Sequence, residues 1–332
     1  MEQFWNFLEE PDESLIYKRN ESGDMRFGEL AETKRNSFGE NRKIVLIGFP
    51  YDEGTIRNHG RPGSALGPDE LRKAFYKLTP TKSSALHDAE TRIFDAGNLK
   101  RNLKLEEALS ILESIVINLL KQEHIPIVIG GSNDLSYADF RGCYSALGRC
   151  GAINIDAHLD VRDYSKGINS GTPYRMLVDQ ETLLGKDFVE YGIQEFANSK
   201  GHLSYAHEKG IHISTLNQIR KRGNSDSRLE HSGSALSFMD AYRIASHETN
   251  NVYVSFDLDS VRSSDAPGVS ASTPTGLAAE EILECAYLAG SDGKTSMIDV
   301  CEFNPKFDVD GHTAKLAAMV VANFLAGLAN RQ

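Results

Sequence analysis

The chain has 332 residues, of which 40% are hydrophobic and 25% are charged, and its formal net charge is -11. A chain of this size and composition can bury a large core in one or two globular domains. An acidic chain argues against a nucleic-acid-binding protein, which needs clustered Lys and Arg to contact phosphates. The apolar stretches are shorter than the ~20 residues of a membrane helix, so no membrane partner is expected.

The cysteines and the start of the chain bear on location. Cys143, Cys150, Cys285 and Cys301 are widely spaced and form no CxxC pair, which argues against a zinc ribbon or a redox motif. So few cysteines in a long chain are typical of a reducing compartment. The acidic first residues lack the apolar run of a secretory signal. We therefore expect a cytoplasmic protein.

Strands and helices are expected to alternate along the chain. Residues 1–42 are polar and predict a short helix and an arm, whereas residues 43–332 predict a single α/β domain. Apolar, β-branched runs predict strands at 43–50, 91–97, 125–131, 151–158, 187–193, 211–214, 252–258 and 296–303. Amphipathic spacing predicts helices at 66–78, 105–122, 134–147, 172–184, 278–290 and 312–329. Residues 215–250 give the weakest pattern, with an exposed loop expected at 221–234 before a helix.

This alternation predicts an α/β fold, a three-layer α-β-α sandwich with a mainly parallel central sheet. Such sheets bind ligands beyond the carboxyl ends of their strands, so polar residues at strand ends are the candidates for a functional site. A nucleotide-binding Rossmann enzyme is disfavoured, because no GxGxxG opens a helix after the first apolar strand.

Three strand ends are rich in side chains that suit a metal. They are Asn133 and Asp134 after 125–131, Asp156, His158 and Asp160 at the end of 151–158, and Asp257 and Asp259 at the end of 252–258. Alternate residues of a strand point to the same side, so each pair separated by one residue is expected to face one point. Asp160 is expected to join from the turn beyond.

Four carboxylates in one small volume repel one another. A like-charge pair ~4 Å apart costs about 4 kcal/mol at an effective dielectric constant of ~20, so protons or cations must lie between them. Carboxylates with one imidazole suit manganese or magnesium, and two such ions could share ligands and activate a water molecule. A single Asp at a strand end is most often a turn former; the metal hypothesis depends on two acidic clusters at the ends of apolar strands.

Taken in order, these segments resemble the ureohydrolase family of arginases, agmatinases and formimidoylglutamases. The motifs are GGSND (130–134), DAHLD (156–160), SFDLD (255–259) with DAPG (265–268), and EFNP (302–305). The stretches at 52–72, 169–177 and 191–211 are similar to formimidoylglutamases more than to arginases. The resemblance implies an arginase-like fold, two manganese ions, and hydrolysis of N-formimidoyl-L-glutamate to L-glutamate and formamide. Hydrolysis of a guanidino substrate is the alternative within the family.

The resemblance also implies roles for single residues. The metal ligands would be Asn133, Asp156, His158, Asp160, Asp257 and Asp259, with Asp156 and Asp257 shared by both ions. Asp160 would orient the attacking water, and Glu302 would accept hydrogen bonds from the amidine end of the substrate. The amino-acid end of the substrate would be held by Arg57, Arg61, Asn169, Ser170 and Arg175. The family also suggests a homo-oligomer.

Asn133 departs from the family pattern, which has a histidine ligand at that point. A carboxamide oxygen is a weaker ligand than imidazole, so one ion is expected to bind loosely or to be absent. This leaves open a different class of protein, a catalytically silent relative that binds a small amino-acid-like ligand. The other five ligand positions keep their expected residue types, which favours an enzyme.

Overall fold

A computed structural model describes residues 4–39, 41, 43–80, 92–223 and 232–331 of the protein. Within these residues one sheet has nine strands in the order β1-β3-β2-β4-β9-β8-β5-β6-β7. The strands are β1 (Leu8–Glu9), β2 (Lys43–Phe49), β3 (Arg92–Leu99), β4 (Ile125–Gly130), β5 (Gly151–Ile155), β6 (Phe188–Ile193), β7 (His212–Thr215), β8 (Val252–Asp257) and β9 (Thr295–Cys301). Neighbouring strands are parallel throughout, except that β1 pairs antiparallel with β3.

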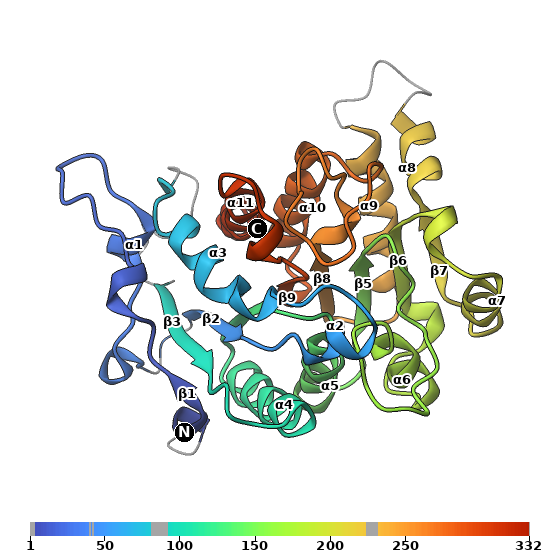
Figure 1. Cartoon of the computed structure of the whole chain (residues 1–332), viewed down its shortest axis with the longest axis horizontal. Coiled ribbons are helices and arrows are strands. Elements are labelled where there is room, and N and C mark those ends of the chain that lie inside the picture. The colour runs from blue at the N-terminus through green and yellow to red at the C-terminus, as the bar shows by residue number, and fades with distance from the viewer. Residues whose placement is uncertain (1–3, 40, 42, 81–91, 224–231, 332) are drawn as a thin grey trace.

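Helices cover both faces of the sheet (Figure 1). One layer contains α3 (Gly67–Phe75), α8 (Leu216–Gly223), α9 (Gly233–Ala245), α10 (Ala279–Ser291) and α11 (His312–Leu328). The opposite layer contains α4 (Leu105–Lys121), α5 (Leu135–Leu147), α6 (Pro173–Asp179) and α7 (Lys200–Glu208). The short helices α1 (Phe27–Leu30) and α2 (Glu53–Arg57) connect other elements. The predicted three-layer sandwich with a mainly parallel sheet is therefore confirmed.

Alternation along the strands explains their unbroken apolar sequences. In β2, Ile44 and Leu46 pack into the cluster shared with α3 and α11, whereas Val45 and Ile47 pack into the cluster shared with α4 and α5. Successive residues of a strand point to opposite faces, and both faces of this sheet are covered, so every position in β2 is buried.

The chain path brings four strand ends together at the centre of the sheet. The crossover from β4 to β5 passes over two positions, which β9 and β8 fill later in the sequence. The strands β4, β9, β8 and β5 are therefore consecutive neighbours and are parallel, so their carboxyl ends lie along one short stretch of edge. This is where an open parallel sheet is expected to bind its ligand.

Most of the expected elements are confirmed, and the differences are local. The predicted helix 172–184 was too long, because α6 ends at Asp179 and Glu181 takes a left-handed φ of 55°. The helices α7 and α8 were not predicted, and α8 contains the first residues of the expected loop at 221–234. Residues 224–231 of that loop lie outside the described residues, and α9 follows it as expected. No helix among the described residues is both long and apolar enough to cross a membrane.

The N-terminal segment packs against the sheet. Its strand β1 extends the edge beside β3, and the Arg35 guanidinium donates to the carbonyl oxygen of Leu8. Three 3₁₀ turns, at Phe4–Phe7, Glu13–Leu15 and Arg35–Ser37, lie in the same segment. The division into an arm at 1–42 and a domain at 43–332 stays a prediction.

A buried ion pair fixes α3 to the edge of the sheet. Arg72 of α3 donates to both carboxylate oxygens of Asp95 in β3, with N–O distances of 2.7 and 2.9 Å. Both side chains are fully buried, and the pKa of the Arg72 guanidinium is raised by Asp95 despite the opposing effect of burial. Removing one partner of such a pair leaves an uncompensated charge in the interior.

We predict that Arg72→Ala lowers the free energy of unfolding by about 3–5 kcal/mol, because it leaves Asp95 buried without its counter-ion. The matched control is Arg101→Ala, which removes an exposed ion pair to Asp69 and should cost at most about 1 kcal/mol. Urea unfolding followed by circular dichroism measures both. Equal losses in the two variants would contradict the role given to the buried pair.

Candidate metal centre

Four neighbouring strand ends supply the side chains of the centre. Asn133 follows β4, Glu302 follows β9, Asp257 ends β8 and Asp156 follows β5. All four side chains are buried. Residues far apart in sequence thus meet at one edge of the sheet, as the positions of the motifs predicted.

Two matching turns place the second residue of each acidic pair. The Asp156 carboxylate accepts a hydrogen bond from the His158 backbone N–H at 2.7 Å, and the Asp257 carboxylate accepts one from the Asp259 N–H at 2.8 Å. Alternation within a strand was expected to produce these pairings, and that expectation was wrong. The strand β5 ends at Ile155 and β8 ends at Asp257, so each first Asp caps a turn that brings the next ionisable residue beside it.

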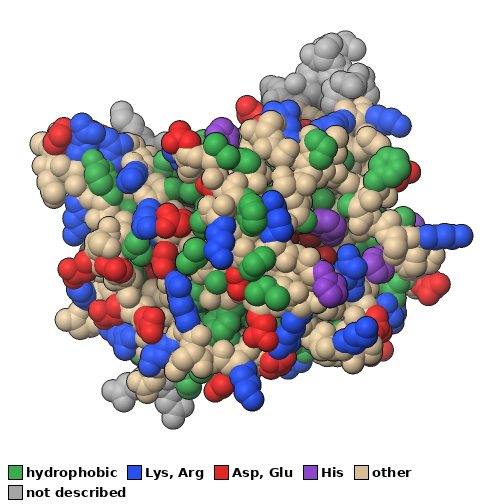
Figure 2. Space-filling view, in the orientation of Figure 1, with side chains coloured by type: hydrophobic (Ala, Val, Ile, Leu, Met, Phe, Trp, Pro, Cys, Tyr) green, Lys and Arg blue, Asp and Glu red, His purple; other side chains and the backbone are tan. Residues whose placement is uncertain are grey.

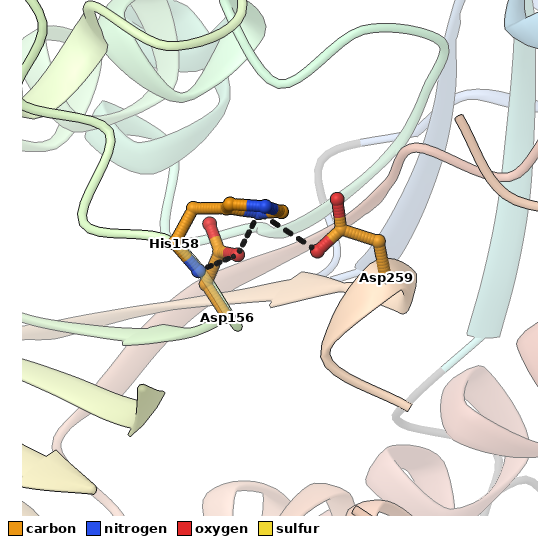
Figure 3. A group of neighbouring side chains, drawn as sticks. All are labelled: Asp156, His158 and Asp259. Atoms are coloured by element: carbon orange, nitrogen blue, oxygen red, sulfur yellow. Dashed lines mark hydrogen bonds and ion pairs between the residues drawn. The ribbon is translucent and has the colours of Figure 1, made fainter. Parts of the chain in front are cut away.

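The carboxylates and the imidazole form two groups with metal-ligand spacing. One group is Asp156, His158 and Asp259, and the other is Asp156, Asp160 and Asp257; within each, the ligand atoms lie within 4.8 Å of one another. Figure 3 shows the first group, in which His158 Nδ1 lies 3.3 Å from an oxygen of Asp156 and 3.3 Å from one of Asp259. Asp156 belongs to both groups. Carboxylate oxygens with one imidazole fit manganese.

Asn133 contacts the centre through its amide nitrogen. Its Nδ2 donates to Asp160 Oδ2 at 2.6 Å, and its Oδ1 accepts from the Ser136 hydroxyl at 2.6 Å. In this arrangement Asn133 holds the Asp160 carboxylate and points its own oxygen away from it. The assignment of Asn133 as a metal ligand therefore stays a prediction.

Glu302 is held in place from two sides. Its carboxylate accepts from the Asn133 backbone N–H at 2.8 Å and from the Thr55 hydroxyl of α2 at 3.1 Å. Both Glu302 and Asp160 have left-handed backbones, with φ of 60° and 46°. Such values are uncommon for residues other than glycine and concentrate at functional sites, because the surrounding structure must hold them.

Burial and mutual repulsion shift the pKa values of the centre in the metal-free protein. Burial, followed by the charge of Asp259, raises the pKa of Asp156 to about 6. Burial also raises the pKa of Asp160 and of Asp257 well above the ordinary range, and it raises that of Glu302 to about 7. The charge of Asp259 raises the pKa of His158 well above its usual value. The centre therefore takes up protons when no metal neutralises it.

Asp134 does not join either ligand group. Asp134 was named with Asn133 among the strand-end side chains that suit a metal, and the structure buries its carboxylate beside Gly54 of α2 instead. Burial raises the pKa of the Asp134 carboxyl to about 7. The first motif thus contributes Asn133, rather than Asp134, to the contacts around Asp160.

The arginines expected to bind the substrate already have partners. Arg57 pairs with Glu53 and Glu106 at 2.7 and 2.6 Å. Arg61 donates to two backbone carbonyls of the 269–270 segment and lies 3.8 Å from the centre of the Phe307 ring. An arginine engaged in this way has fewer donors left for a ligand.

The other substrate candidates lie in the segment that follows Asp160 and in α6. The Asn169 side chain accepts from the Gly171 N–H, and the Ser170 hydroxyl accepts from Asn58 at 2.9 Å. Arg175 lies 3.4 Å from Asp179 and 4.4 Å from the centre of the Tyr205 ring. Asn169 and Ser170 thus form a turn that packs against α2, and the binding roles of all these residues stay predictions.

Sequence reasoning missed Thr55, Asn58 and Arg162. Thr55 and Asn58 lie in and next to α2, a five-residue helix that gives no periodic signal. Arg162 follows Asp160 by two residues, and that spacing was the available signal. On the face shown in Figure 2, histidine and basic side chains lie beside a shaded hollow.

The fold and the carboxylate-rich centre define an α/β protein of the metal-dependent hydrolase class. The arginase family model matches residues 42–327. The chain belongs to the arginase family. The predicted membership is thus confirmed over most of the sequence.

Individual relatives agree with this membership. A formimidoylglutamase from Hahella chejuensis is 34% identical over 296 residues, which cover 86% of this chain and 85% of that protein. A Trypanosoma cruzi formiminoglutamase solved with Mn²⁺ is 35% identical, with a TM-score of 0.83 over 93% of this chain and 100% of that one. A variant of the Trypanosoma cruzi protein with one asparagine replaced by histidine, also solved with Mn²⁺, is 34% identical with a TM-score of 0.82, over 93% of this chain and 99% of that one.

We predict that the stability of the metal-free protein falls as pH rises. The pKa values of Asp156 and Glu302, about 6 and about 7, exceed the ~4 of unfolded carboxyls. The native state therefore binds more protons than the unfolded state between about pH 4 and pH 7. Each carboxyl with a raised pKa stabilises the native state below this window, and that contribution is lost as the pH rises through it. Urea unfolding with chelator should give a free energy a few kcal/mol lower at about pH 8 than at about pH 5.5.

Manganese should abolish this fall, because the cation then compensates the charges that protons compensate at low pH. The control is the same pair of measurements with saturating Mn²⁺. A metal-free protein at least as stable at about pH 8 as at about pH 5.5 would show that the carboxyls are not crowded as described.

We predict that Asp257→Asn weakens manganese binding while the fold is kept, since it removes a charge from the Asp156, Asp160 and Asp257 group. The loss should be at least about 10-fold in affinity, measured by isothermal titration with Mn²⁺. The control is Asp163→Asn, which changes an exposed carboxylate three residues after Asp160. Unchanged manganese affinity in Asp257→Asn would remove this residue from the ligand set.

Proposed function

We propose that the chain is a manganese-dependent C–N hydrolase of linear amidines, with N-formimidoyl-L-glutamate as substrate and L-glutamate and formamide as products. The observation that carries this proposal is the pair of ligand groups that share Asp156, with the Glu302 carboxylate fixed beside them. Relatives named formimidoylglutamase, and a relative solved with Mn²⁺, support the substrate and the metal.

Two manganese ions would be held by Asp156, His158, Asp160, Asp257 and Asp259, with Asn133 beside Asp160. When bound, manganese supplies positive charge and lowers the pKa of a water molecule in the centre. The buried, mutually repelling carboxylates fit such a cation, because each of them gains from its charge.

Asp160 is positioned to handle the proton of the attacking water. Asn133 Nδ2 donates to Oδ2 of this carboxylate and fixes its orientation, and Oδ1 has two lone pairs, one for a metal and one for a hydrogen bond from the water. As water adds to the amidine carbon, the C–N bond to the glutamate nitrogen breaks, and that nitrogen needs a proton. Asp160 would accept the proton from the water and deliver it to the leaving nitrogen.

Glu302 would orient the amidine. A protonated amidine presents planar N–H groups, and a carboxylate facing them accepts short, directional hydrogen bonds. The Asn133 N–H and the Thr55 hydroxyl fix this carboxylate before substrate arrives, so little ordering is needed on binding.

We predict that the manganese-loaded protein hydrolyses N-formimidoyl-L-glutamate, and that Glu302→Gln lowers kcat/KM by about 10²–10³-fold through loss of a preorganised charge. Formamide and glutamate release are measured for this substrate, arginine, agmatine and guanidinobutyrate. The control variant is Glu280→Gln, an exposed carboxylate in the first turn of α10.

Each outcome of this assay selects one hypothesis. Preference for arginine or agmatine would assign the chain to guanidino substrates. Absence of turnover on all four compounds, with manganese bound, would favour a silent relative that binds a small ligand.

A homo-oligomer and a cytoplasmic location complete the proposal. The four cysteines are all buried and unpaired, which suits a reducing compartment. Sedimentation velocity measures the oligomeric state, and cell fractionation measures the location.

A further inference from the structure

Arg162 has no charge partner among the residues that the structure describes. Its guanidinium forms no hydrogen bond, ion pair or ring contact with any residue that the structure describes, and its side chain is exposed. Every other arginine whose side chain is described has at least one such partner. A guanidinium that has no partner among the described residues can bind a ligand, and this one lies close in sequence to the candidate metal centre.

The backbone fixes Arg162 at the rim of the centre. It lies two residues after Asp160, and its N–H donates to the Gly171 carbonyl at 2.8 Å. Its side chain crosses Gly171 so closely that a Cβ there would lie 2.5 Å from Arg162 Cδ. The turn that contains Gly171 packs on α2, because the Ser170 N–H donates to the Gly54 carbonyl. Arg162 is therefore joined, through Gly171, to the turn that packs on the helix whose Thr55 contacts Glu302.

Two further basic side chains, those of His202 and Arg175, lie near Arg162. His202 of α7 is half-buried, and its pKa is lowered first by burial and then by the charges of Arg162 and Arg175. Arg175 shares its charge with Asp179 and lies over Tyr205. The unpaired cation of this cluster is thus Arg162.

We propose that Arg162 binds the γ-carboxylate of the substrate and so selects an amidine that carries a glutamate. This inference rests on the proposed function, and it extends that function to a specificity-determining residue. In N-formimidoyl-L-glutamate the γ-carboxylate carbon lies five bonds, about 6 Å, from the amidine carbon. The Cα atoms of Asp160 and Arg162 are at most about 7.6 Å apart, which matches this reach.

Charge supports the same assignment. The centre is rich in carboxylates, so the substrate's own carboxylates must be neutralised at its rim. A guanidinium fork binds both oxygens of a carboxylate, and here it gives up no existing ion pair to do so. Arg57 and Arg61 would first have to leave the partners they already contact.

The test compares Arg162→Gln with the wild type on two substrates, N-formimidoyl-L-glutamate and N-formimidoyl-L-glutamine, which has a carboxamide in place of the γ-carboxylate. On the first substrate the variant should raise KM by about 10–150-fold with little change in kcat, as expected for loss of a charge-assisted hydrogen-bond pair. On the second substrate the two proteins should have similar kcat/KM. Arg162→Lys, which keeps the charge but not the fork, should recover part of the loss.

A binding measurement separates this role from a structural one. L-Glutamate should bind the wild type and lose affinity by a similar factor in Arg162→Gln, as measured by isothermal titration calorimetry. The control is Arg243→Gln, an exposed arginine paired with Asp240 in α9.

Two outcomes would overturn the inference while the proposed function stands: a wild-type KM in Arg162→Gln, or equal losses on both substrates. A wild type that fails to hydrolyse formimidoylglutamate would instead overturn the proposed function.

Discussion

The repulsion among buried carboxylates is the constraint on which the centre depends. Asp156, Asp160, Asp257 and Asp259 approach one another at the ends of β5 and β8, and the same burial that gathers them raises the pKa of the first three. The parallel sheet supplies the energy for this gathering, because its two apolar faces are covered by helices. Bound protons or a bound cation can then reduce the repulsion among these carboxylates.

Asp95 and the centre differ in how the charge of a buried carboxylate is compensated. Asp95 in β3 receives a guanidinium from Arg72 at both oxygens, so its charge is compensated by the chain itself. At the centre, among the described residues, His158 is the one basic side chain in ion-pair contact with these carboxylates. A site that gathers this much negative charge with one imidazole is arranged for a divalent ion.

The fold and the ligand types were largely readable from the sequence, whereas their local geometry was not. Unbroken apolar runs such as 125–131 identify buried parallel strands, and acidic residues directly after such runs identify the functional edge. The turns at Asp156 and Asp257 could not be predicted from the sequence. In each turn the Asp side chain accepts a hydrogen bond from the N–H two residues later, so the two ionisable residues have the same i, i+2 spacing as in an extended strand.

Partners distant in sequence also decided which arginines are free. Glu106 occupies Arg57 and the carbonyls of residues 269 and 270 occupy Arg61, and neither contact has a local sequence signal. That Arg162 has no partner among the described residues could therefore be learned only from the structure.

The late insertion of β8 and β9 between β4 and β5 has a consequence for how the chain folds. The contact between the Asn133 N–H and Glu302 closes a loop of 169 residues. Contacts of such long range form slowly, since the entropy of closing the loop is lost before the contact stabilises anything. During synthesis the strands up to β7 emerge with a gap at the middle of the sheet, and no ion can find its full set of oxygens until that gap is filled. Capture of manganese thus requires β8 and the turn after it, which supply Asp257 and Asp259, and a product truncated before β8 lacks that half of the ligand set.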